Sequence, residues 1–228
     1  MRVVFERKTE LLPTIWEFYF RPERPLNYVP GQYVDLRLPH DSPDSRGSSR
    51  TFTLTSLPDE SLLSFAVKIV DPCSSYKQVL RNLEVGDEAT ITDAMGDVIL
   101  PKDPSVPLLF VAGGLGIASF VSIMRYLTRV NERRDIGLFY ALRNKSDRLY
   151  QATFEAYQFP FKTTLFASHE AQERLSAKII AEQLPIDGLF YLSGSESFVE
   201  SLLWDLKTHF KVPDERLVYD FFSGYIEL

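Results

Sequence analysis

The sequence of 228 residues is poor in cysteine, in histidine and in long apolar runs. Its one cysteine, Cys73, excludes an internal disulfide, a zinc cluster built on cysteines and a four-cysteine iron–sulfur centre. Any iron–sulfur partner must therefore be another protein. The three histidines, His40, His169 and His209, lack the spacing of metal ligands, so we predict no metal site and only surface or local hydrogen-bonding roles for them.

No apolar run approaches the roughly 20 residues of a transmembrane helix, and the N-terminal stretch MRVVFERKTELLP lacks the apolar core of a secretory signal. We therefore expect a cytoplasmic protein without a transmembrane segment. The formal charge of −6 and the lack of a long Lys/Arg cluster argue against a nucleic-acid partner. The shares of hydrophobic residues, 45%, and charged residues, 25%, are typical of a folded protein.

Short alternating segments separated by turn residues run through Leu100 and are typical of an antiparallel sheet or a small barrel. In QYVDLRL, residues 32–38, apolar side chains alternate with polar ones, so one face of this strand should be buried. SFAVKIV, residues 64–70, repeats the pattern, and DPCSSYKQVLRNL begins as a turn and becomes helical. The first part therefore predicts an antiparallel β-barrel with one short helix.

Three prolines in PKDPSVP, residues 101–107, separate this part from a different pattern. We predict one domain over residues 1–102 and a second over residues 103–228. In the second, apolar runs that suit strands buried on both faces alternate with helical patterns. The five strand candidates are LLFVAG, DIGLFYAL, KTTLFAS, GLFYLSG and RLVYDFF. This alternation predicts an α/β domain with a parallel five-stranded sheet.

A strand runs into glycines at VAGGLGIASF, residues 111–120, and a helix begins at once. Free amides at a helix N-terminus attract phosphate, so Gly113, Gly114 and Gly116 predict a nucleotide site. The stretch is not the usual dinucleotide fingerprint, because Ser119 stands where a further glycine is needed and Arg143 replaces the acidic ribose ligand. The alternative is that these glycines only allow a tight turn from strand to helix.

A second candidate site is SRTFTLTS, residues 49–56, which places Arg50 and Phe52 on one face of a strand. An arginine fork suits phosphate oxygens, an aromatic ring stacks on a flat heterocycle, and Thr53 can hydrogen-bond a ring edge. Together these groups predict a flavin nucleotide site. The alternative is a solvated arginine beside a core phenylalanine.

With these two motifs in this order, the chain resembles the ferredoxin–NADP reductase family over nearly its whole length. SRTFTLTS is similar to the family's R-x-[YF]-[ST] flavin motif, and VAGGLGIASF to its G-G-x-G-[IL] nucleotide loop. PGQYVDLRLP and LEVGDEATITDAMGDVIL resemble its barrel strands. FYLSGSESFVESLLWDL resembles the strand, C-G-P turn and helix near the nicotinamide, and DFFSGY a terminal aromatic segment. The resemblance implies a flavin-binding antiparallel barrel followed by an NAD(P)-binding α/β domain.

The resemblance also implies residue roles. Arg50 would bind the flavin phosphate, Phe52 would stack on the isoalloxazine ring, and Thr53, as a catalytic residue, would hydrogen-bond near its N5. Further flavin contacts would come from Thr51, Val67, Lys68, Ile69, Ser74, Ser75 and Phe222, with Phe222 and Tyr225 as a terminal aromatic lid. The nicotinamide nucleotide would be held by Gly113, Gly114, Gly116, Ile117, Arg143, Gly194 and Ser195, with Ser193 as a second catalytic residue.

The chain departs from the family pattern beside the expected nicotinamide. Ser193 replaces a cysteine, Ser195 replaces a proline, and Ala118–Ser119 replaces a Thr-Pro pair. A serine lacks polarizable sulfur, so we expect altered or slower hydride transfer. The alternative is a neutral change in a turn.

The preferred nucleotide and flavin both remain open at this point. Arg143, Lys145 and Arg148 could meet a 2′-phosphate and slightly favour NADPH over NADH, although Glu170 and Glu173 lie nearby in sequence. The turn DPCSSY offers a place for a pyrophosphate, which favours FAD over FMN.

We predict a flavin-dependent NAD(P)H oxidoreductase that passes electrons from NAD(P)H through a bound flavin to a separate acceptor. The acceptor would be a redox protein, such as a ferredoxin or an oxygenase component, or a small molecule. An alternative is a flavin-binding electron-transfer or regulatory subunit of a larger redox complex with weak direct NAD(P)H activity. A third possibility is a non-catalytic scaffold whose motifs are vestigial.

Overall fold

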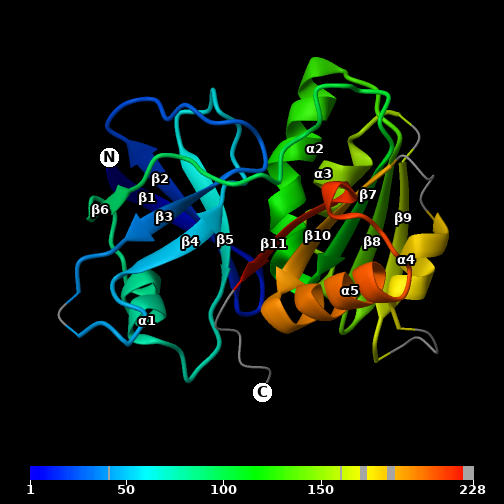
Figure 1. The fold of residues 1–228 in the computed structure, drawn as a ribbon. Helices are drawn as coiled ribbons and strands as arrows, with labels where there is room; N and C mark the ends of the chain where they lie inside the picture. Colours follow the sequence, from blue (N-terminus) through cyan, green and yellow to red (C-terminus); the bar gives the residue numbers. More distant parts are fainter. Residues whose placement is uncertain (41, 160, 170–173, 184–187, 223–228) are drawn as a thin grey trace. The chain divides into compact units, whose positions relative to one another are not determined.

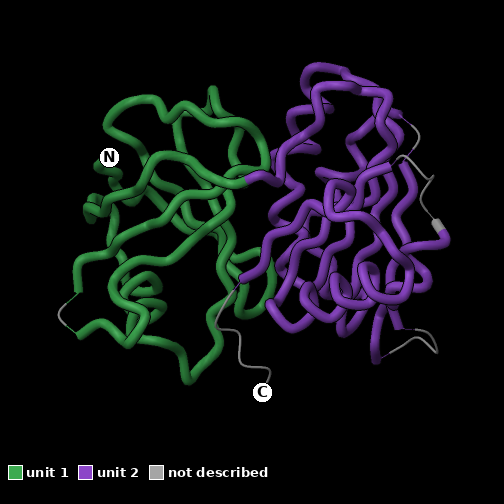
Figure 2. The backbone as a smooth tube through the Cα atoms, in the orientation of Figure 1, with its two compact units in different colours: residues 1–96 green, residues 97–228 purple. Residues whose placement is uncertain are grey.

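The structure is a computed structural model that describes residues 1–40, 42–159, 161–169, 174–183 and 188–222. It divides into two compact units, unit 1 with residues 1–96 and unit 2 with residues 97–228, which Figure 2 colours separately. The domain boundary placed after residue 102 stays a prediction. Each unit has its own sheet and its own core, and the two are described in turn.

Unit 1 is a six-stranded antiparallel sheet with one short helix (Figure 1). Its elements are β1 (Arg2–Leu12), β2 (Ile15–Pro22), β3 (Tyr33–Arg37), β4 (Ser49–Thr53), β5 (Leu63–Lys68), α1 (Ser75–Arg81) and β6 (Glu88–Ile91). The strand order is β4-β3-β6-β1-β2-β5. The expected antiparallel sheet with a single short helix is thus confirmed.

The sheet of unit 1 is barrel-like but not closed. Its two end strands, β4 and β5, share no ladder of hydrogen bonds within the described residues. They come together just beyond β4, where the Thr55 amide donates to the Ser64 carbonyl at 2.8 Å. The expected barrel therefore differs in its closure, because the chain leaves β4 after Thr53 before a ladder to β5 can form.

Alternation along the strands builds the core of unit 1. In β3 and the residue that follows it, Val34, Leu36 and Leu38 are fully buried, as their period-two spacing predicts. Phenylalanine rings fill the centre, with Phe20 stacked on Phe65 at 5.5 Å between centroids. Burial of such a side chain stabilises the fold by about 1.5–3 kcal/mol.

Unit 2 is a doubly wound α/β unit whose sheet has five parallel strands. Its strands are β7 (Leu108–Gly113), β8 (Ile136–Leu142), β9 (Phe161–Ala167), β10 (Leu189–Ser195) and β11 (Leu217–Phe222). Its α-helices are α2 (Ala118–Val130), α3 (Gln151–Glu155), α4 (Ala177–Gln183) and α5 (Glu196–Thr208). Helices α2 and α3 cover one face of the sheet, and α4 and α5 cover the other (Figure 1). All five predicted strands and their parallel arrangement are confirmed.

The strand order of unit 2, β11-β10-β7-β8-β9, places the first strand in the middle of the sheet. The chain moves from β7 toward β8 and later returns to β10 on the other side, so a topological switch point lies between β7 and β10. Open α/β sheets bind ligands beyond the carboxyl ends of the strands at such a point. A 3₁₀ turn, η1 (Gly114–Ile117), follows β7 there and precedes α2.

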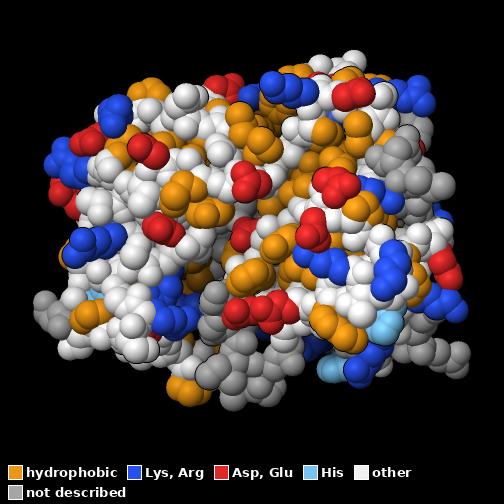
Figure 3. Space-filling model, in the orientation of Figure 1, with side chains coloured by type: hydrophobic (Ala, Val, Ile, Leu, Met, Phe, Trp, Pro, Cys, Tyr) orange, Lys and Arg blue, Asp and Glu red, His pale blue; other side chains and the backbone are white. Residues whose placement is uncertain are grey.

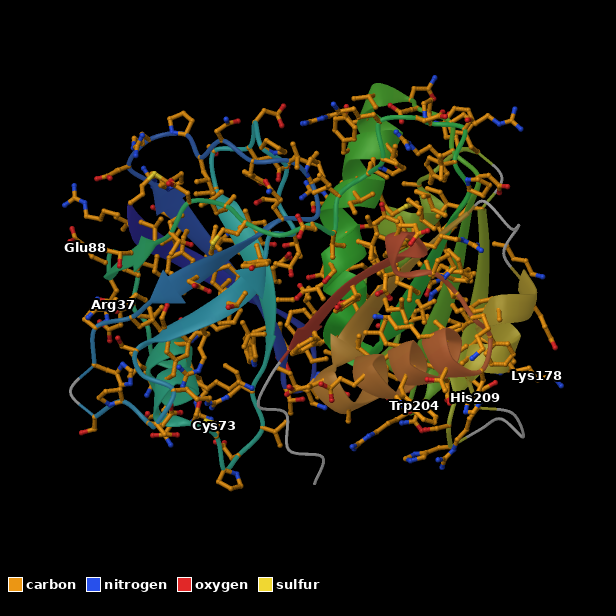
Figure 4. All side chains as sticks on the ribbon, viewed as in Figure 1. Arg37, Cys73, Glu88, Lys178, Trp204 and His209 are labelled. Atoms are coloured by element: carbon orange, nitrogen blue, oxygen red, sulfur yellow. The ribbon has the colours of Figure 1, made fainter. Side chains whose placement is uncertain are left out.

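Charged and apolar side chains are interspersed on the face shown in Figure 3. Trp204 of α5 is 60% exposed, and its ring contacts that of His209 at 5.0 Å on the outside of unit 2 (Figure 4). The described helices include none that combines the length and the apolar character needed to span a bilayer.

Among the described glycines of unit 2, Gly116 leaves the least room for a side chain. A Cβ atom there would lie 2.1 Å from the Ser193 carbonyl oxygen and 2.6 Å from the Gly194 nitrogen, both backbone atoms of β10. At Gly137 in β8 an added Cβ would meet only the tip of the Leu109 side chain, at 3.0 Å. A side chain tip can move aside, whereas the backbone of a central strand cannot.

We therefore expect Gly116→Ala to lower the free energy of unfolding by about 3 kcal/mol or more, and Gly137→Ala to lower it by about 1 kcal/mol or less. Urea unfolding in a Trp16→Phe background isolates unit 2, because Trp204 is then the only tryptophan. Equal losses in the two glycine variants would contradict the close backbone approach.

Candidate functional site

Both terminal nitrogens of Arg50 on β4 are already engaged within unit 1. Its Nη2 donates to both carboxylate oxygens of Asp44, at 2.6 and 2.8 Å. Its Nη1 lies within hydrogen-bonding distance of the carbonyl oxygens of Arg46 (3.1 Å), Gly47 (2.9 Å) and Ser49 (2.6 Å). An arginine has four terminal N–H groups, so a phosphate that meets this fork must replace one of these acceptors.

Arg50 and Asp44 form a partly shielded ion pair, with side chains 15% and 27% exposed. Burial opposes ionisation of Asp44, but hydrogen bonds from Arg50 and Arg46 outweigh it and hold the pKa of the carboxyl below its ordinary value. The pair ties the loop before β4 to the strand. Sequence reasoning missed Asp44, because a polar loop gives no periodic signal.

Phe52 lies beside Arg50 on β4 and is half-buried. One face of its ring stacks on Phe65 of β5, with 4.4 Å between centroids and 13° between planes. A flavin ring that stacks on Phe52 must therefore contact a part of the phenylalanine ring that Phe65 does not cover. The Phe52 side chain thus also packs against the core, as the alternative interpretation expects.

The two threonines of the motif lie in different environments. Thr51 is exposed and donates to an Asp35 carboxylate oxygen on β3 at 2.6 Å. Thr53 is only 3% exposed. Their assignment to the flavin stays a prediction, and the burial of Thr53 restricts which ligand atoms could reach its hydroxyl.

Strand β5 presents its backbone rather than its side chains. Val67 and Ile69 are buried in the core of unit 1, whereas Lys68 between them is half-buried. Because β5 is an end strand of the sheet, its outer edge faces away from β2. The Ile69 amide already donates to the Thr14 carbonyl at 2.7 Å, so by strand alternation Lys68 between Val67 and Ile69 is the residue whose backbone faces outward. The backbone contacts that the resemblance implies for Val67 and Ile69 stay predictions.

Helix α1 begins at Ser75, and Ser74 is its N-cap, whose hydroxyl accepts from the Lys77 amide at 3.3 Å. The Ser75 Oγ is buried without a hydrogen-bond partner among the described residues. Tyr76, the next residue, packs under Arg50, whose guanidinium lies 4.9 Å from the ring centroid. Arg50, Ser74 and Ser75, predicted from separate motifs, are therefore brought to one region of unit 1.

Positive charge concentrates at this region in a basic cluster that consists of Arg46, Arg50, Lys68 and Lys77. Burial, as the largest cause, and the charges of Arg46, Lys68 and Arg50 together lower the pKa of Lys77 to about 8. Like charges held together in this way favour a bound anion, which would relieve their repulsion. Sequence reasoning missed Lys77, because a lysine on a short helix normally lies in solvent.

The only cysteine, Cys73, precedes α1 (Figure 4). Burial raises the pKa of its thiol, and the hydrogen bond and charge of Asp71 raise it further. Little thiolate is therefore present at neutral pH. Within the described residues, no three His, Cys, Asp or Glu side chains gather as metal ligands would.

In unit 2, the predicted glycines and serines meet at the switch point between β7 and β10. Gly113 ends β7, and the parallel register places Ala112 opposite Ser193. The Phe198 ring of α5 packs on both Gly113 and Gly194, within 2.8 and 2.7 Å of where a Cβ atom would stand. Gly114, by contrast, is exposed, with φ of +53° and no atom within 4 Å of its Cβ position. The open part of the loop is therefore at Gly114.

Ser193 is fully buried, and its hydroxyl pairs with that of Ser119 at 2.9 Å. Both residues depart from the family pattern, and the structure brings them together although 74 positions separate them. This hydroxyl pair links the start of α2 to the end of β10. The catalytic role of Ser193 stays a prediction, and in unit 2 its side chain faces Ser119 rather than solvent.

The remaining predicted nucleotide ligands surround this loop. Ile117 is buried, whereas Arg143 is exposed just after β8 and its carbonyl accepts from the His169 amide at 3.0 Å. Ser195 lies opposite Phe222 in the β10–β11 register. The predicted lid residue Tyr225 and the acidic residues Glu170 and Glu173 lie outside the described residues.

Comparison with known proteins agrees with this arrangement. Residues 110–201, which include the switch point, match the family model described as an oxidoreductase NAD-binding domain. Flavohemoprotein A of Dictyostelium discoideum is 23% identical over 96% of this chain. The ferredoxin–NAD(P)(+) reductase component of the Pseudomonas putida naphthalene 1,2-dioxygenase system is 26% identical over 90% of it. The chain spans 59% and 64% of these two relatives, respectively.

Solved structures show the same fold. The flavohem-like FAD/NAD-binding domain of the nitric oxide dioxygenase of Vibrio cholerae O1 biovar El Tor superimposes with a TM-score of 0.78 and 21% identity, over 97% of this chain and 98% of that one. Ferredoxin–NADP+ reductase of Plasmodium falciparum gives a TM-score of 0.77 and 18% identity, over 97% and 95%.

The chain therefore combines an antiparallel barrel-like unit with a stretch that matches an oxidoreductase NAD-binding domain. Its fold is that of the solved ferredoxin–NADP+ reductase, so the resemblance seen in its motifs is confirmed at the level of the fold.

The basic cluster makes a direct prediction about Lys77. Arg46→Gln should raise the pKa of Lys77 from about 8 toward its ordinary value, because a neighbouring like charge disappears. An NMR titration of the ¹³C-methylated lysines measures this change. Glu23→Gln, an exposed change at the end of β2, is the control and should leave Lys77 unaltered. An unchanged pKa in the Arg46 variant would show that the cluster does not act on Lys77.

Proposed function

We propose that the protein is a flavin-dependent NAD(P)H oxidoreductase that passes electrons from NAD(P)H through a bound flavin to a separate acceptor. The observation that carries the proposal is the combination, in one chain, of an oxidoreductase NAD-binding domain with a unit whose R-x-F-T strand and α1 gather positive charge. FAD is present in a flavohemoglobin of Malassezia yamatoensis that shares this fold at a TM-score of 0.78. The bound flavin and nicotinamide supply the redox chemistry.

In this proposal unit 1 holds the flavin. The basic cluster and the hydroxyls of Ser74 and Ser75 bind its phosphates, and Phe52 contributes an aromatic surface. The backbone of residues 67–69, at the end of β5 and just after it, contacts the polar rim of its ring, with the outward-facing groups of Lys68 as the hydrogen-bonding partners. Further proposed contacts to the flavin come from Thr51, Thr53 and Phe222.

Unit 2 holds the nicotinamide nucleotide at the switch point. Its phosphates approach the open backbone at Gly114, because Phe198 fills the space over Gly113 and Gly194. Arg143 meets the 2′-phosphate of NADPH, which is the preferred donor over NADH. The buried pair of Ser119 and Ser193 fixes the loop against β10, so Ser193 supports nucleotide binding by holding the loop in place.

The acceptor is proposed to be a separate redox protein, such as a ferredoxin or an oxygenase component, in a cytoplasmic setting. Support comes from similar proteins that act as electron-transfer components. One of them belongs to the 2-halobenzoate 1,2-dioxygenase of Burkholderia cepacia and is 26% identical over 79% of this chain. The alternative function, a flavin-binding subunit with weak direct NAD(P)H activity, is favoured by the burial of Ser193 away from solvent in unit 2.

The decisive experiment is a visible spectrum of the purified protein supplied with flavin, followed by anaerobic titration with NADPH and NADH. We expect a yellow protein that either nucleotide bleaches, NADPH at lower concentration. Arg143→Ala should remove that difference, because it removes the charge that meets the 2′-phosphate. A colourless protein would overturn the proposal, and a yellow protein that neither nucleotide bleaches would establish the subunit alternative.

Asp44 competes with the flavin phosphate for the same guanidinium fork in this proposal. Asp44→Asn should therefore tighten flavin binding roughly two- to fivefold, the size expected for a partly shielded ion pair near the surface, whereas Arg50→Ala should weaken it. Fluorescence titration of the flavin measures both, with Glu23→Gln as the control. Weaker binding in the Asp44 variant would show that Asp44 positions Arg50 for the phosphate and does not compete with it.

A further inference from the structure

A network of buried polar side chains in unit 1 joins the chain that follows β4 to β2 and β5. Its members come from separate stretches of the sequence and are at most 8% exposed. They are Glu17 of β2, Tyr28, Thr55, Ser56 and Ser64 of β5. Buried polar groups need hydrogen-bond partners, so the positions of these side chains constrain one another.

The carboxylate of Glu17 is the centre of this network. One of its oxygens accepts from the Thr55 hydroxyl at 2.6 Å, and the other accepts from the Tyr19 hydroxyl at 2.6 Å. The Thr55 Oγ1 also lies 2.8 Å from the Ser64 Oγ. Because Thr55 gives its one hydroxyl proton to Glu17, the Ser64 hydroxyl donates to Thr55. Hydrogen bonds of this length to a carboxylate are strong and fix the direction of the donor.

The network acts where β4 lacks a second neighbouring strand. Among the described residues, β4 forms a ladder only with β3, although it carries the R-x-F-T motif. Just beyond it, the Thr55 amide donates to the Ser64 carbonyl at 2.8 Å, and the Ser64 amide donates to the Ser56 hydroxyl at 3.1 Å. The Ser56 hydroxyl pairs with that of Tyr28 at 3.0 Å. These bonds, together with Glu17, hold the end of the motif strand against β5.

The groups around Glu17 on its solvent side support its role as an acceptor. The guanidinium carbon of Arg7 lies 3.4 Å from the centroid of the Tyr19 ring. Burial, followed by the hydrogen bond and charge of Glu17, raises the pKa of Tyr19, so its hydroxyl keeps the proton that it donates. Desolvation makes a buried carboxylate a weak source of net stability, whereas its directed bonds select one geometry. Glu17 should therefore affect the position of the motif strand more than the stability of unit 1.

We propose that Glu17 is a positioning residue for flavin binding, which acts through Thr55 on the strand that carries Arg50 and Phe52. Glu17 lies outside every motif from which the flavin site is predicted, and it acts without a contact to the flavin. The proposal rests on the proposed function and adds a residue on which the shape of that site depends.

Hydrogen exchange of the protein without added flavin measures the effect on β4. Thr55→Val removes the hydroxyl at similar shape and should speed exchange of the β4 amides about tenfold, because local opening becomes easier. Tyr19→Phe removes a donor to Glu17 without a change near β4 and should speed it about threefold. Thr55→Ser keeps the hydroxyl and should restore slow exchange. Thr90→Val, an exposed change on β6, is the matched control.

Fluorescence titration of the same variants with FAD measures the effect on binding, with circular dichroism as the check that each variant is folded. Thr55→Val and Glu17→Gln should weaken FAD binding roughly tenfold, the effect of one hydrogen bond to a charged group, and Tyr19→Phe about threefold. Thr55→Ser and Thr90→Val should bind FAD as the unaltered protein does. Should Thr55→Val not fold, Tyr19→Phe decides, because its half-buried ring stays in place.

The outcomes separate this inference from the proposed function. If the unaltered protein binds no FAD, the proposed function fails and the inference fails with it. If FAD binds, and Thr55→Val, Glu17→Gln and Tyr19→Phe leave its affinity unchanged, only the role of Glu17 is overturned, even where these variants are less stable. Equal losses of affinity in Thr55→Val and Thr55→Ser also overturn it, because the hydroxyl would then not be the cause.

Discussion

The backbone contact between Gly116 and β10 is the constraint on which the organisation of unit 2 depends. With no side chain at Gly116, the 3₁₀ turn after β7 lies directly against the Ser193 carbonyl and the Gly194 amide. This contact fixes where α2 begins, and therefore keeps the exposed Gly114 beyond the carboxyl end of the central strand. The hydroxyl pair of Ser119 and Ser193 reinforces the same junction from the buried side.

In unit 1 the feature that defines the candidate site is electrostatic rather than steric. Four cationic side chains converge near the start of α1, and the terminal N–H groups of Arg50 are matched by backbone carbonyls and Asp44. Burial and, after it, the neighbouring positive charges lower the pKa of Lys77. Perturbed pKa values of this kind cluster at functional sites.

The regular parts of both units could be predicted from the sequence because they depend on local patterns. Alternation in β3 and the apolar runs of β7 and β10 reflect which faces are buried, and the glycine loop reflects a tight turn. Contacts that depend on tertiary structure left no such signal. Two of these contacts join segments that are distant in sequence: Phe198 packs on two glycines, and Ser119 pairs with Ser193. The opening between β4 and β5 likewise depends on how distant strands meet.

The hydroxyl pair at the switch point also has a consequence for chemical durability. Flavoproteins that react with oxygen generate peroxide, and a thiol beside the nucleotide is open to stepwise oxidation. Ser119 and Ser193 contain no sulfur, and the only thiol of the chain, Cys73, is partly buried with a raised pKa in the other unit. The junction between the glycine loop and β10 therefore contains no thiol that peroxide or alkylating agents could modify.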